Sequence, residues 1–260
     1  MSRQLVLIKF GGSLITDKRQ PFTVRPEKLE FLAAELAAAR QANPEADFII
    51  GNGAGSFGHF TAHEYGLREG ARTAEQYYGM SVTHNGVVRL NTLVAEALTK
   101  QHIPAFAVSP AALFTCADKQ LDGQHIAPLV NLLRAGCIPV LHGDTITDTV
   151  RGTTILSTEK VLQACLEALA ASYDQVFVIY LLDIDGVLSG EGVVIPKLSP
   201  AAEVQVRHDL QHDVTGGILG KVVSARQATA LAKKVYIASG SKTGVIAAAL
   251  AGQNVGTQVL

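Results

Sequence analysis

The segment DFIIGNGAGSFGH, residues 47–59, joins a short apolar run to a loop that contains four glycines and ends in a histidine. The apolar run predicts a buried β-strand, and the loop would follow the carboxyl end of that strand. Successive glycines allow backbone N–H groups to approach phosphate oxygens closely. This segment therefore predicts an α/β protein that binds an anionic ligand at this edge of its sheet.

Short strand-like runs alternate with longer helical patterns along the rest of the chain. This alternation predicts a mostly parallel sheet that is covered by helices on both faces. The apolar runs show little alternation with polar residues, which is typical of strands buried on both faces. We expect strands at 4–10, 47–51, 104–110, 138–144, 176–186, 235–239 and 256–260, and helices at 26–42, 73–101, 126–135, 157–173, 216–234 and 241–252.

The composition favours one domain and argues against several classes of protein. The chain has 260 residues, with 22 Lys and Arg against 23 Asp and Glu, so no basic excess indicates nucleic-acid binding. Its three cysteines form no CxxC pair, which favours a reduced, cytoplasmic location. Its apolar start is too short for a signal peptide, and no run reaches the roughly 18 residues of a membrane helix. We expect a soluble protein that binds neither nucleic acid nor membrane.

Three further loops would lie at the same edge of the sheet as the opening segment. They are KFGGS at 9–13, HGD at 142–144 and DVTGGILGK at 213–221, the last of which leads into a predicted helix. Lys9 and Lys221 add full positive charges to two of these loops. A helix N-terminus adds about half a positive charge. Several such loops together indicate a phosphate-bearing ligand.

Two known phosphate-binding motifs are approximated but not matched. Gly53, Gly55 and Gly58 fit GxGxxG after a strand, yet the window 69–80 reads as helix, where a dinucleotide fold needs a second strand. GGILGK has one residue too few for a Walker loop, and Val222 replaces its Ser or Thr. We therefore favour neither interpretation.

Metal binding has weak support in the sequence. HxxxH pairs begin at His59 and His208, but neither has an obvious third ligand, so surface or capping histidines are favoured. Asp183 and Asp185 fit a metal site and a strand-end turn equally well, and both interpretations stay open. We assign no metal ligand to the protein itself.

With these motifs, the chain resembles the amino acid kinase superfamily, and within it the isopentenyl phosphate kinases. The resemblance covers essentially the whole chain, and the histidine that ends GSFGH is its most specific feature. Among members of the superfamily, that histidine marks kinases whose acceptor carries a phosphate or phosphonate. The resembling segments, in order, are KFGGSLITDK at 9–18, GNGAGSFGH at 51–59, LHGD at 141–144, LLDIDGV at 181–187 and DVTGGILGK at 213–221.

The resemblance implies a three-layer αβα sandwich with a mostly parallel central sheet. Residues 1–260 would form a single domain, with a phosphate-acceptor lobe at about 1–174 and a nucleotide lobe at about 175–260. ATP would donate the phosphoryl group, Mg²⁺ would accompany the nucleotide, and a homodimer is usual in the family. The implied reaction converts isopentenyl phosphate to isopentenyl diphosphate.

The resemblance also implies roles for individual residues. Carried over by motif, the ATP phosphates would contact Lys9, Gly11, Gly12 and Ser13, and the nucleotide would also contact Asp183, Gly217 and Lys221. Lys18 would stabilise the transition state, Glu159 would orient the lysines, and the acceptor phosphate would be bound by His59. Acceptor and nucleotide phosphates would meet at Ala54 and Gly55, and Gly143 or Asp144 would also touch the acceptor.

Elementary chemistry agrees with a histidine at the acceptor phosphate. A phosphate monoester has a second pKa near 6 and is largely a dianion at neutral pH. Such an acceptor needs no general base; it needs donors that hold it against the like-charged ATP. The N–H group of His59 could supply such a donor.

Two residues depart from the family pattern, and other functions remain open. Glu159 stands where the family usually has Asp, and Ala54 stands where it commonly has Gly. Tyr77, Tyr78 and Met80 could wall the pocket for the acceptor tail or belong to the core. The alternatives are a kinase for another small phosphate or phosphonate such as fosfomycin, a non-catalytic nucleotide sensor, and a dinucleotide-dependent oxidoreductase.

Overall fold

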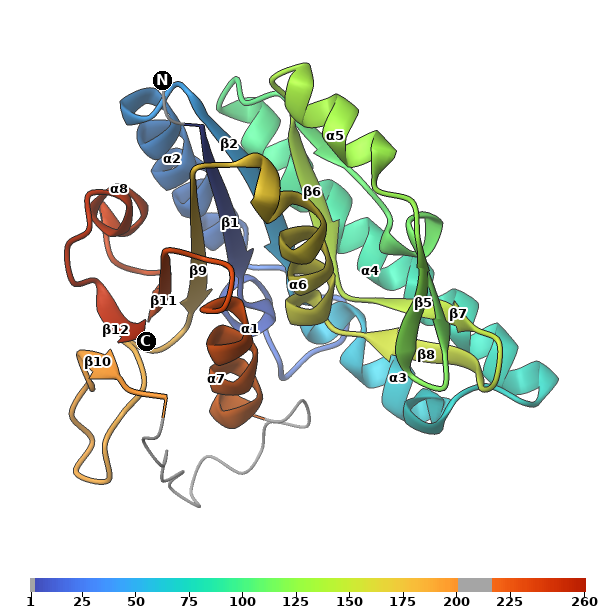
Figure 1. Cartoon of the computed structure of the whole chain (residues 1–260). Helices are drawn as coiled ribbons and strands as arrows, with labels where there is room; N and C mark the ends of the chain where they lie inside the picture. Colours follow the sequence, from blue (N-terminus) through green and yellow to red (C-terminus); the bar gives the residue numbers. More distant parts are fainter. Residues whose placement is uncertain (1–2, 201–216) are drawn as a thin grey trace.

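The central sheet has eight strands, in the order β10-β12-β11-β9-β1-β2-β6-β3 (Figure 1). The computed structural model describes residues 3–200 and 217–260. Strand β1 lies between β2 and β9 and is parallel to both, and among the described residues only the pairing of β11 with β12 is antiparallel in this sheet. The strands are β1 (Gln4–Phe10), β2 (Ala46–Asn52), β3 (Ala105–Ala107), β6 (Ile138–His142), β9 (Gln175–Leu182), β10 (Lys197–Leu198), β11 (Lys234–Ser239) and β12 (Gly256–Val259).

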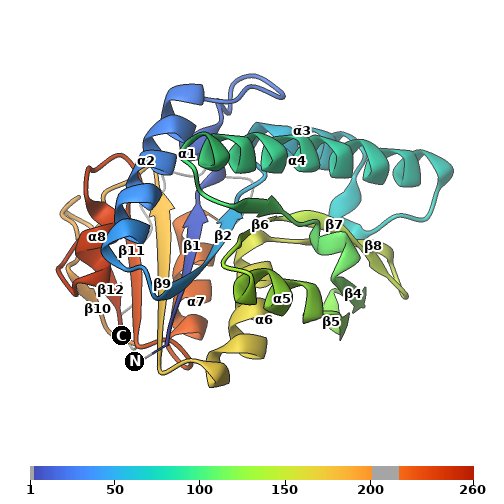
Figure 2. The same ribbon diagram turned by 90° about the horizontal axis from the view of Figure 1, so that it is seen from above.

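Helices cover both faces of this sheet, which confirms the predicted three-layer αβα architecture. Figure 2 shows α2, α4 and α8 on one face and α5, α6 and α7 on the other. The long helices are α2 (Pro26–Ala42), α4 (Ala74–Lys100), α5 (Ala127–Arg134), α6 (Thr158–Leu169) and α7 (Gly217–Ala228), and the short ones are α1 (Gly12–Ile15), α3 (His59–Glu64) and α8 (Val245–Leu250).

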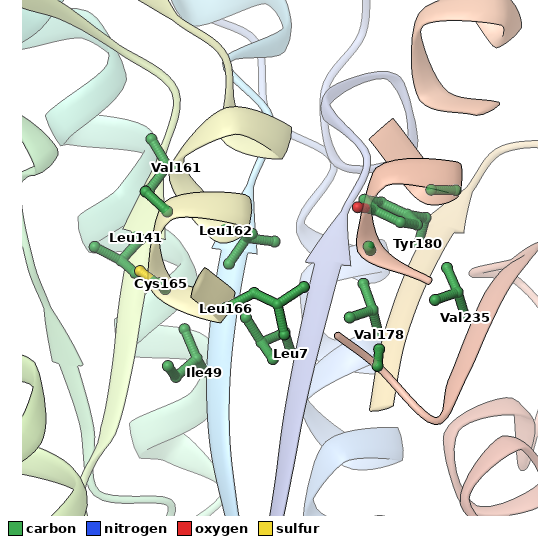
Figure 3. Packing of buried hydrophobic residues seen from close by; sticks show 14 of the residues in the cluster. Leu7, Ile49, Leu141, Val161, Leu162, Cys165, Leu166, Val178, Tyr180 and Val235 are labelled. Carbon is green, nitrogen blue, oxygen red and sulfur yellow. The ribbon is translucent and has the colours of Figure 1, made fainter. Parts of the chain in front are cut away.

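The core consists of one apolar cluster on each face of the sheet. Alternate residues of β1 enter different clusters: Leu7 belongs to one and Ile8 to the other, and neither is exposed. Figure 3 shows Leu162 and Leu166 of α6 packed in the same cluster as Leu7 and Ile49. Because both faces are covered, β1 has no polar side that would produce an alternating pattern.

A second sheet of four strands lies beside the central one, and it was not predicted. Its order is β5-β4-β7-β8. The nearly buried Asp148 stabilises its turns by accepting hydrogen bonds from the backbone N–H groups of Asp118, Lys119, Val150 and Arg151. The contacts with Asp118 and Lys119 join segments about 30 residues apart in sequence, so no local pattern predicts them. The strands are β4 (Phe114–Ala117), β5 (Gln120–Gln124), β7 (Asp144–Asp148) and β8 (Gly152–Leu156).

Several predicted elements are shorter than expected. Helix α7 ends at Ala228 and not near 234, and α8 begins only after Gly244, whose φ of +75° lies outside the helical region. His208 and the first part of the predicted loop 213–221 lie outside the described residues. In the part of the chain that the structure describes, no helix is long and apolar enough to span a membrane.

Candidate active site

Two glycine loops meet backbone to backbone where β1 and β2 end. A Cβ added to Gly12 would lie 2.5 Å from the backbone N of Gly55, and one added to Gly53 would lie 2.6 Å from the N of Gly12. The Thr16 hydroxyl joins the loops, since it donates to the Gly12 carbonyl (2.7 Å) and accepts from the Ser56 N–H (3.0 Å). The predicted nucleotide loop and the predicted acceptor loop are therefore in direct contact.

A buried lysine at the end of β1 pairs with the first turn of α6. Lys9 is only 4% exposed, and its Nζ forms an ion pair with Glu159. Burial raises the pKa of the Glu159 carboxyl, but Lys9 and, more weakly, Lys221 outweigh burial and hold this pKa below its ordinary value. The structure thus brings together three of the predicted catalytic residues, and Glu159 carries the charge expected of the usual Asp.

The loop that carries Lys18 docks onto the second glycine loop. Lys18 itself is exposed between α1 and α2. The backbone N–H groups of Phe22 and Thr23 donate to the carbonyl and hydroxyl oxygens of Ser56, at 3.1 and 3.2 Å. The Phe22 ring also meets Phe57 edge to face, 5.7 Å between centroids. These contacts hold the predicted transition-state lysine on a loop fixed to the site.

An arginine that sequence reasoning missed connects the remaining nucleotide-side residues. Arg25 donates from Nη1 to the Ser13 carbonyl at 3.3 Å, and the same nitrogen lies 3.6 Å from an Asp183 carboxylate oxygen. The Gly11 N–H donates a 2.8 Å hydrogen bond to the carbonyl of Leu181, near the end of β9. Gly217, another predicted nucleotide contact, is the first residue of α7. Arg25 directly precedes α2, and no sequence motif distinguishes it from a surface residue.

The predicted acceptor residues His59, Ala54 and Gly143 occupy three different settings. His59 is the exposed first residue of α3. The Ala54 methyl faces Gly58, because a Cβ added to Gly58 would lie 2.8 Å from it. Gly143 is buried against the start of α6, where an added Cβ would lie 2.9 Å from the Thr158 nitrogen. A residue larger than glycine would therefore not fit at Gly58, beside Ala54, or at Gly143.

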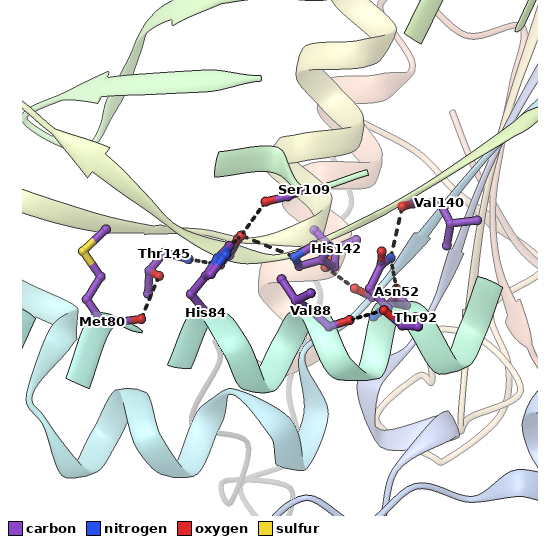
Figure 4. A network of polar contacts seen from close by, with 12 residues as sticks. Asn52, Met80, His84, Val88, Thr92, Ser109, Val140, His142 and Thr145 are labelled. Atoms are coloured by element: carbon purple, nitrogen blue, oxygen red, sulfur yellow. Dashed lines mark hydrogen bonds and ion pairs between the residues drawn. The ribbon is translucent and has the colours of Figure 1, made fainter. Parts of the chain in front are cut away.

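The predicted acceptor residue Asp144 contacts His84, Ser109 and His142, three members of the polar network that Figure 4 labels. Its side chain is 0% exposed, and its oxygens lie 2.9 and 3.0 Å from Nδ1 of His84 on α4. Two turns further along the same face of α4, Asn91 donates a 2.8 Å hydrogen bond to Asn52 at the end of β2. Sequence reasoning missed His84, although the seven-residue spacing of these two polar side chains on a helix was a usable signal.

Taken together, the site gathers cationic side chains and glycine loops at the carboxyl ends of β1, β2 and β6. Phosphoryl transfer requires chiefly alignment and neutralisation of charge, and such an arrangement can supply both. Within residues 3–200 and 217–260, no group of three or more His, Cys, Asp or Glu side chains is placed to hold a metal ion.

Comparisons with known proteins find similar sequences and a similar fold. The model of the amino acid kinase family matches residues 4–239. Isopentenyl phosphate kinase of Methanothermobacter thermautotrophicus is 30% identical over 98% of both chains, and that of Haloferax volcanii is 32% identical over 84% of this chain and 86% of its own. A solved structure of an isopentenyl phosphate kinase superposes with a TM-score of 0.80 at 24% identity, covering 98% of this chain and all of the other, and it shows the shared fold.

Proposed function

This chain belongs to the amino acid kinase family, and from that premise we propose that it phosphorylates isopentenyl phosphate to isopentenyl diphosphate with ATP. The observation that carries the proposal is the direct contact of the two glycine loops, in which Gly12, expected to face the ATP phosphates, lies against Gly55, where acceptor and nucleotide phosphates would meet. Two relatives at 30% and 32% identity are isopentenyl phosphate kinases, which supports the choice of acceptor.

In the proposed reaction, an oxygen of the acceptor phosphate attacks the γ-phosphorus of ATP. The bond from that phosphorus to the β–γ bridging oxygen breaks, and ADP leaves with the bond's electron pair. The acceptor is already largely a dianion, so no general base is required. His59 would hold the acceptor phosphate, while Lys9, Lys18 and Lys221 would neutralise charge on the transferring group.

The supporting residues have roles that follow from their contacts. Glu159 would keep the Lys9 ammonium in place through their ion pair. Gly11, Gly12, Ser13 and Gly55 would direct backbone N–H groups at phosphate oxygens. Asp183 and Gly217 would contact the nucleotide, and Ala54, Gly143 and Asp144 would border the acceptor.

Mg²⁺ belongs to the same proposal, as a cation held through the phosphates of ATP. The proposal assigns the ion no ligand from the protein itself. The ion would neutralise charge between the β- and γ-phosphates. Homodimer formation, expected from the resemblance, and a cytoplasmic location, expected from the cysteine usage, remain parts of this proposal.

The proposal is tested by ADP release with ATP, Mg²⁺ and a panel of acceptors. The panel contains isopentenyl, dimethylallyl and geranyl phosphates, fosfomycin, acetylglutamate and UMP. Turnover on the five-carbon phosphates, well above that on the other compounds, is the expected result. Preferred turnover on fosfomycin would keep the chemistry and replace the acceptor, whereas ATP binding without turnover on any acceptor would favour a sensor.

A further inference from the structure

A carboxylate is buried where β6 passes into β7, beside the predicted acceptor site. Asp144 accepts hydrogen bonds from the Thr145 N–H (2.8 Å) and the Ser109 hydroxyl (3.4 Å), besides facing His84. His142, itself 1% exposed, places Nε2 3.3 Å from the same carboxylate. Burial raises the pKa of Asp144, but the two histidines outweigh burial and hold it below its ordinary value. The carboxylate is therefore ionised at neutral pH.

The proton on His84 is located by this contact. Both Asp144 oxygens lie within 3.0 Å of Nδ1, so this nitrogen must carry hydrogen and act as the donor. The hydrogen bond to Asp144 raises the pKa of His84, against a smaller opposing effect of partial burial. This favours the imidazolium form, in which Nε2 also carries a hydrogen.

His84 is the member of this network that reaches solvent. Its side chain is 33% exposed, whereas that of Asp144 is 0% exposed. No residue that the structure describes forms a hydrogen bond with Nε2. An ionised Asp144 that faced a phosphate dianion directly would repel it, and the histidine instead presents a positive group in its place.

The turn of α4 that carries His84 packs against the segment that presents His59. Thr83 donates a 2.9 Å hydrogen bond to Thr61, two residues after His59. A Cβ added to Gly58 would lie 2.8 Å from Val87 of the same helix. His84 and His59 therefore sit on two elements that are fixed to each other.

We propose that His84 is a second acceptor-binding residue, whose imidazolium contacts the acceptor phosphate together with His59, and that Asp144 is the residue that positions it. The inference rests on the proposed function, in which the acceptor bears a phosphate group. In this proposal Asp144 affects acceptor binding through His84, and it does not touch the acceptor itself. This contact should increase the binding affinity of acceptors with a doubly charged phosphate more than that of uncharged or singly charged acceptors.

Steady-state kinetics of ADP release separates this role from a structural one. His84→Gln is expected to raise KM for isopentenyl phosphate about 10-fold or more, the value of one hydrogen bond to a charged group, with KM for ATP unchanged within about twofold. Asp144→Asn is expected to act in the same direction. His102→Asn is the matched control, since this exposed histidine lies just beyond the end of α4 and has a φ of 57° that Asn tolerates. An unchanged acceptor KM, or an equal rise in both KM values, overturns the proposal.

Histidine NMR tests the contact without relying on turnover. The ring Cε1–H signal of His84 is assigned by its absence from the spectrum of His84→Gln and followed at constant pH. A saturable shift on addition of isopentenyl phosphate is expected, and turnover of that compound with no shift overturns the inference. If isopentenyl phosphate is not a substrate, the proposed function fails separately. Titration with inorganic phosphate then decides, since a saturable shift supports a phosphate contact at His84 and its absence overturns it.

Discussion

Lys9 is a buried cation whose charge is balanced by Glu159. With 5% of the lysine side chain and 14% of the glutamate side chain exposed, neither charge is well solvated. Such a pair contributes little net stability as a whole, but removal of one partner leaves an uncompensated buried charge. Glu159, although one methylene longer than the usual Asp, supplies the carboxylate that balances Lys9, and the charge of Lys9 in turn helps to hold the pKa of Glu159 below its ordinary value.

Replacement of Glu159 by Gln is expected to lower the free energy of unfolding by about 3 kcal/mol at pH 7, because Lys9 loses its counter-ion. The loss is expected above the ordinary glutamate pKa of 4.5. It should shrink as pH falls through the lower pKa of Glu159 in the folded parent, because the protonated Glu159 is then as neutral as the Gln that replaces it. Urea unfolding between pH 3 and pH 7 measures it. Glu167→Gln, at an exposed site on the same helix, should change stability by less than about 0.5 kcal/mol; an equal effect would contradict the argument.

His59 is predicted to act on the acceptor and to contribute little to folding. Because it is exposed, His59→Ala should leave the free energy of unfolding within about 0.5 kcal/mol of the parent. Loss of one charge-assisted hydrogen bond should lower kcat/KM for isopentenyl phosphate about 10- to 100-fold. His63→Ala, on the same short helix and also exposed, is the control. Near-normal turnover by His59→Ala would refute the role.

At the scale of elements, helix and strand positions were predictable wherever local chemistry determines them. Helix α2 was predicted with its observed bounds, because Pro26 suits a first turn and its pattern ends at Ala42. The second sheet was not predicted, since Asp148 organises it through residues about 30 positions away. The glycine loops were recognised individually, but their mutual contact through Thr16 depends on the parallel pairing of β1 with β2.

Gly12→Ala tests whether the contact between the glycine loops matters. The new methyl would lie 2.5 Å from a backbone nitrogen, so the loops must separate. We expect loss of most kinase activity and a destabilisation of about 1–3 kcal/mol, the usual cost of overpacking. Gly136→Ala is the control, because nothing lies within 4 Å of its added Cβ and only its φ of +72° is strained. Full activity of Gly12→Ala would show that the loops need not touch.

At the scale of the whole molecule, one sheet crosses the predicted boundary between lobes. Strand β9 begins at Gln175, at the start of the predicted nucleotide lobe, and pairs along its length with β1 of the acceptor lobe. The apolar cluster on each face of the sheet includes residues from both sides of that boundary. The fold class could thus be predicted from alternating patterns, while the division into lobes stays a prediction.

A shared sheet and shared core predict one cooperative unfolding transition. Far-UV circular dichroism, which reports helices, and near-UV tyrosine signals should change together with temperature, since the chain has six Tyr and no Trp. Coincident curves are the expected result. Two separated transitions would indicate lobes that fold independently, contrary to the continuity of the sheet.

In the proposed reaction, the phosphate group of isopentenyl phosphate accepts the γ-phosphoryl group of ATP at this site. Phosphorus NMR of a reaction with ATP, Mg²⁺ and isopentenyl phosphate tests it most directly, because the product's two phosphorus atoms couple to each other. We predict loss of the monophosphate signal and growth of a pair of coupled doublets from isopentenyl diphosphate, in equal amount to ADP. Formation of ADP and free phosphate with isopentenyl phosphate unchanged would contradict the claim.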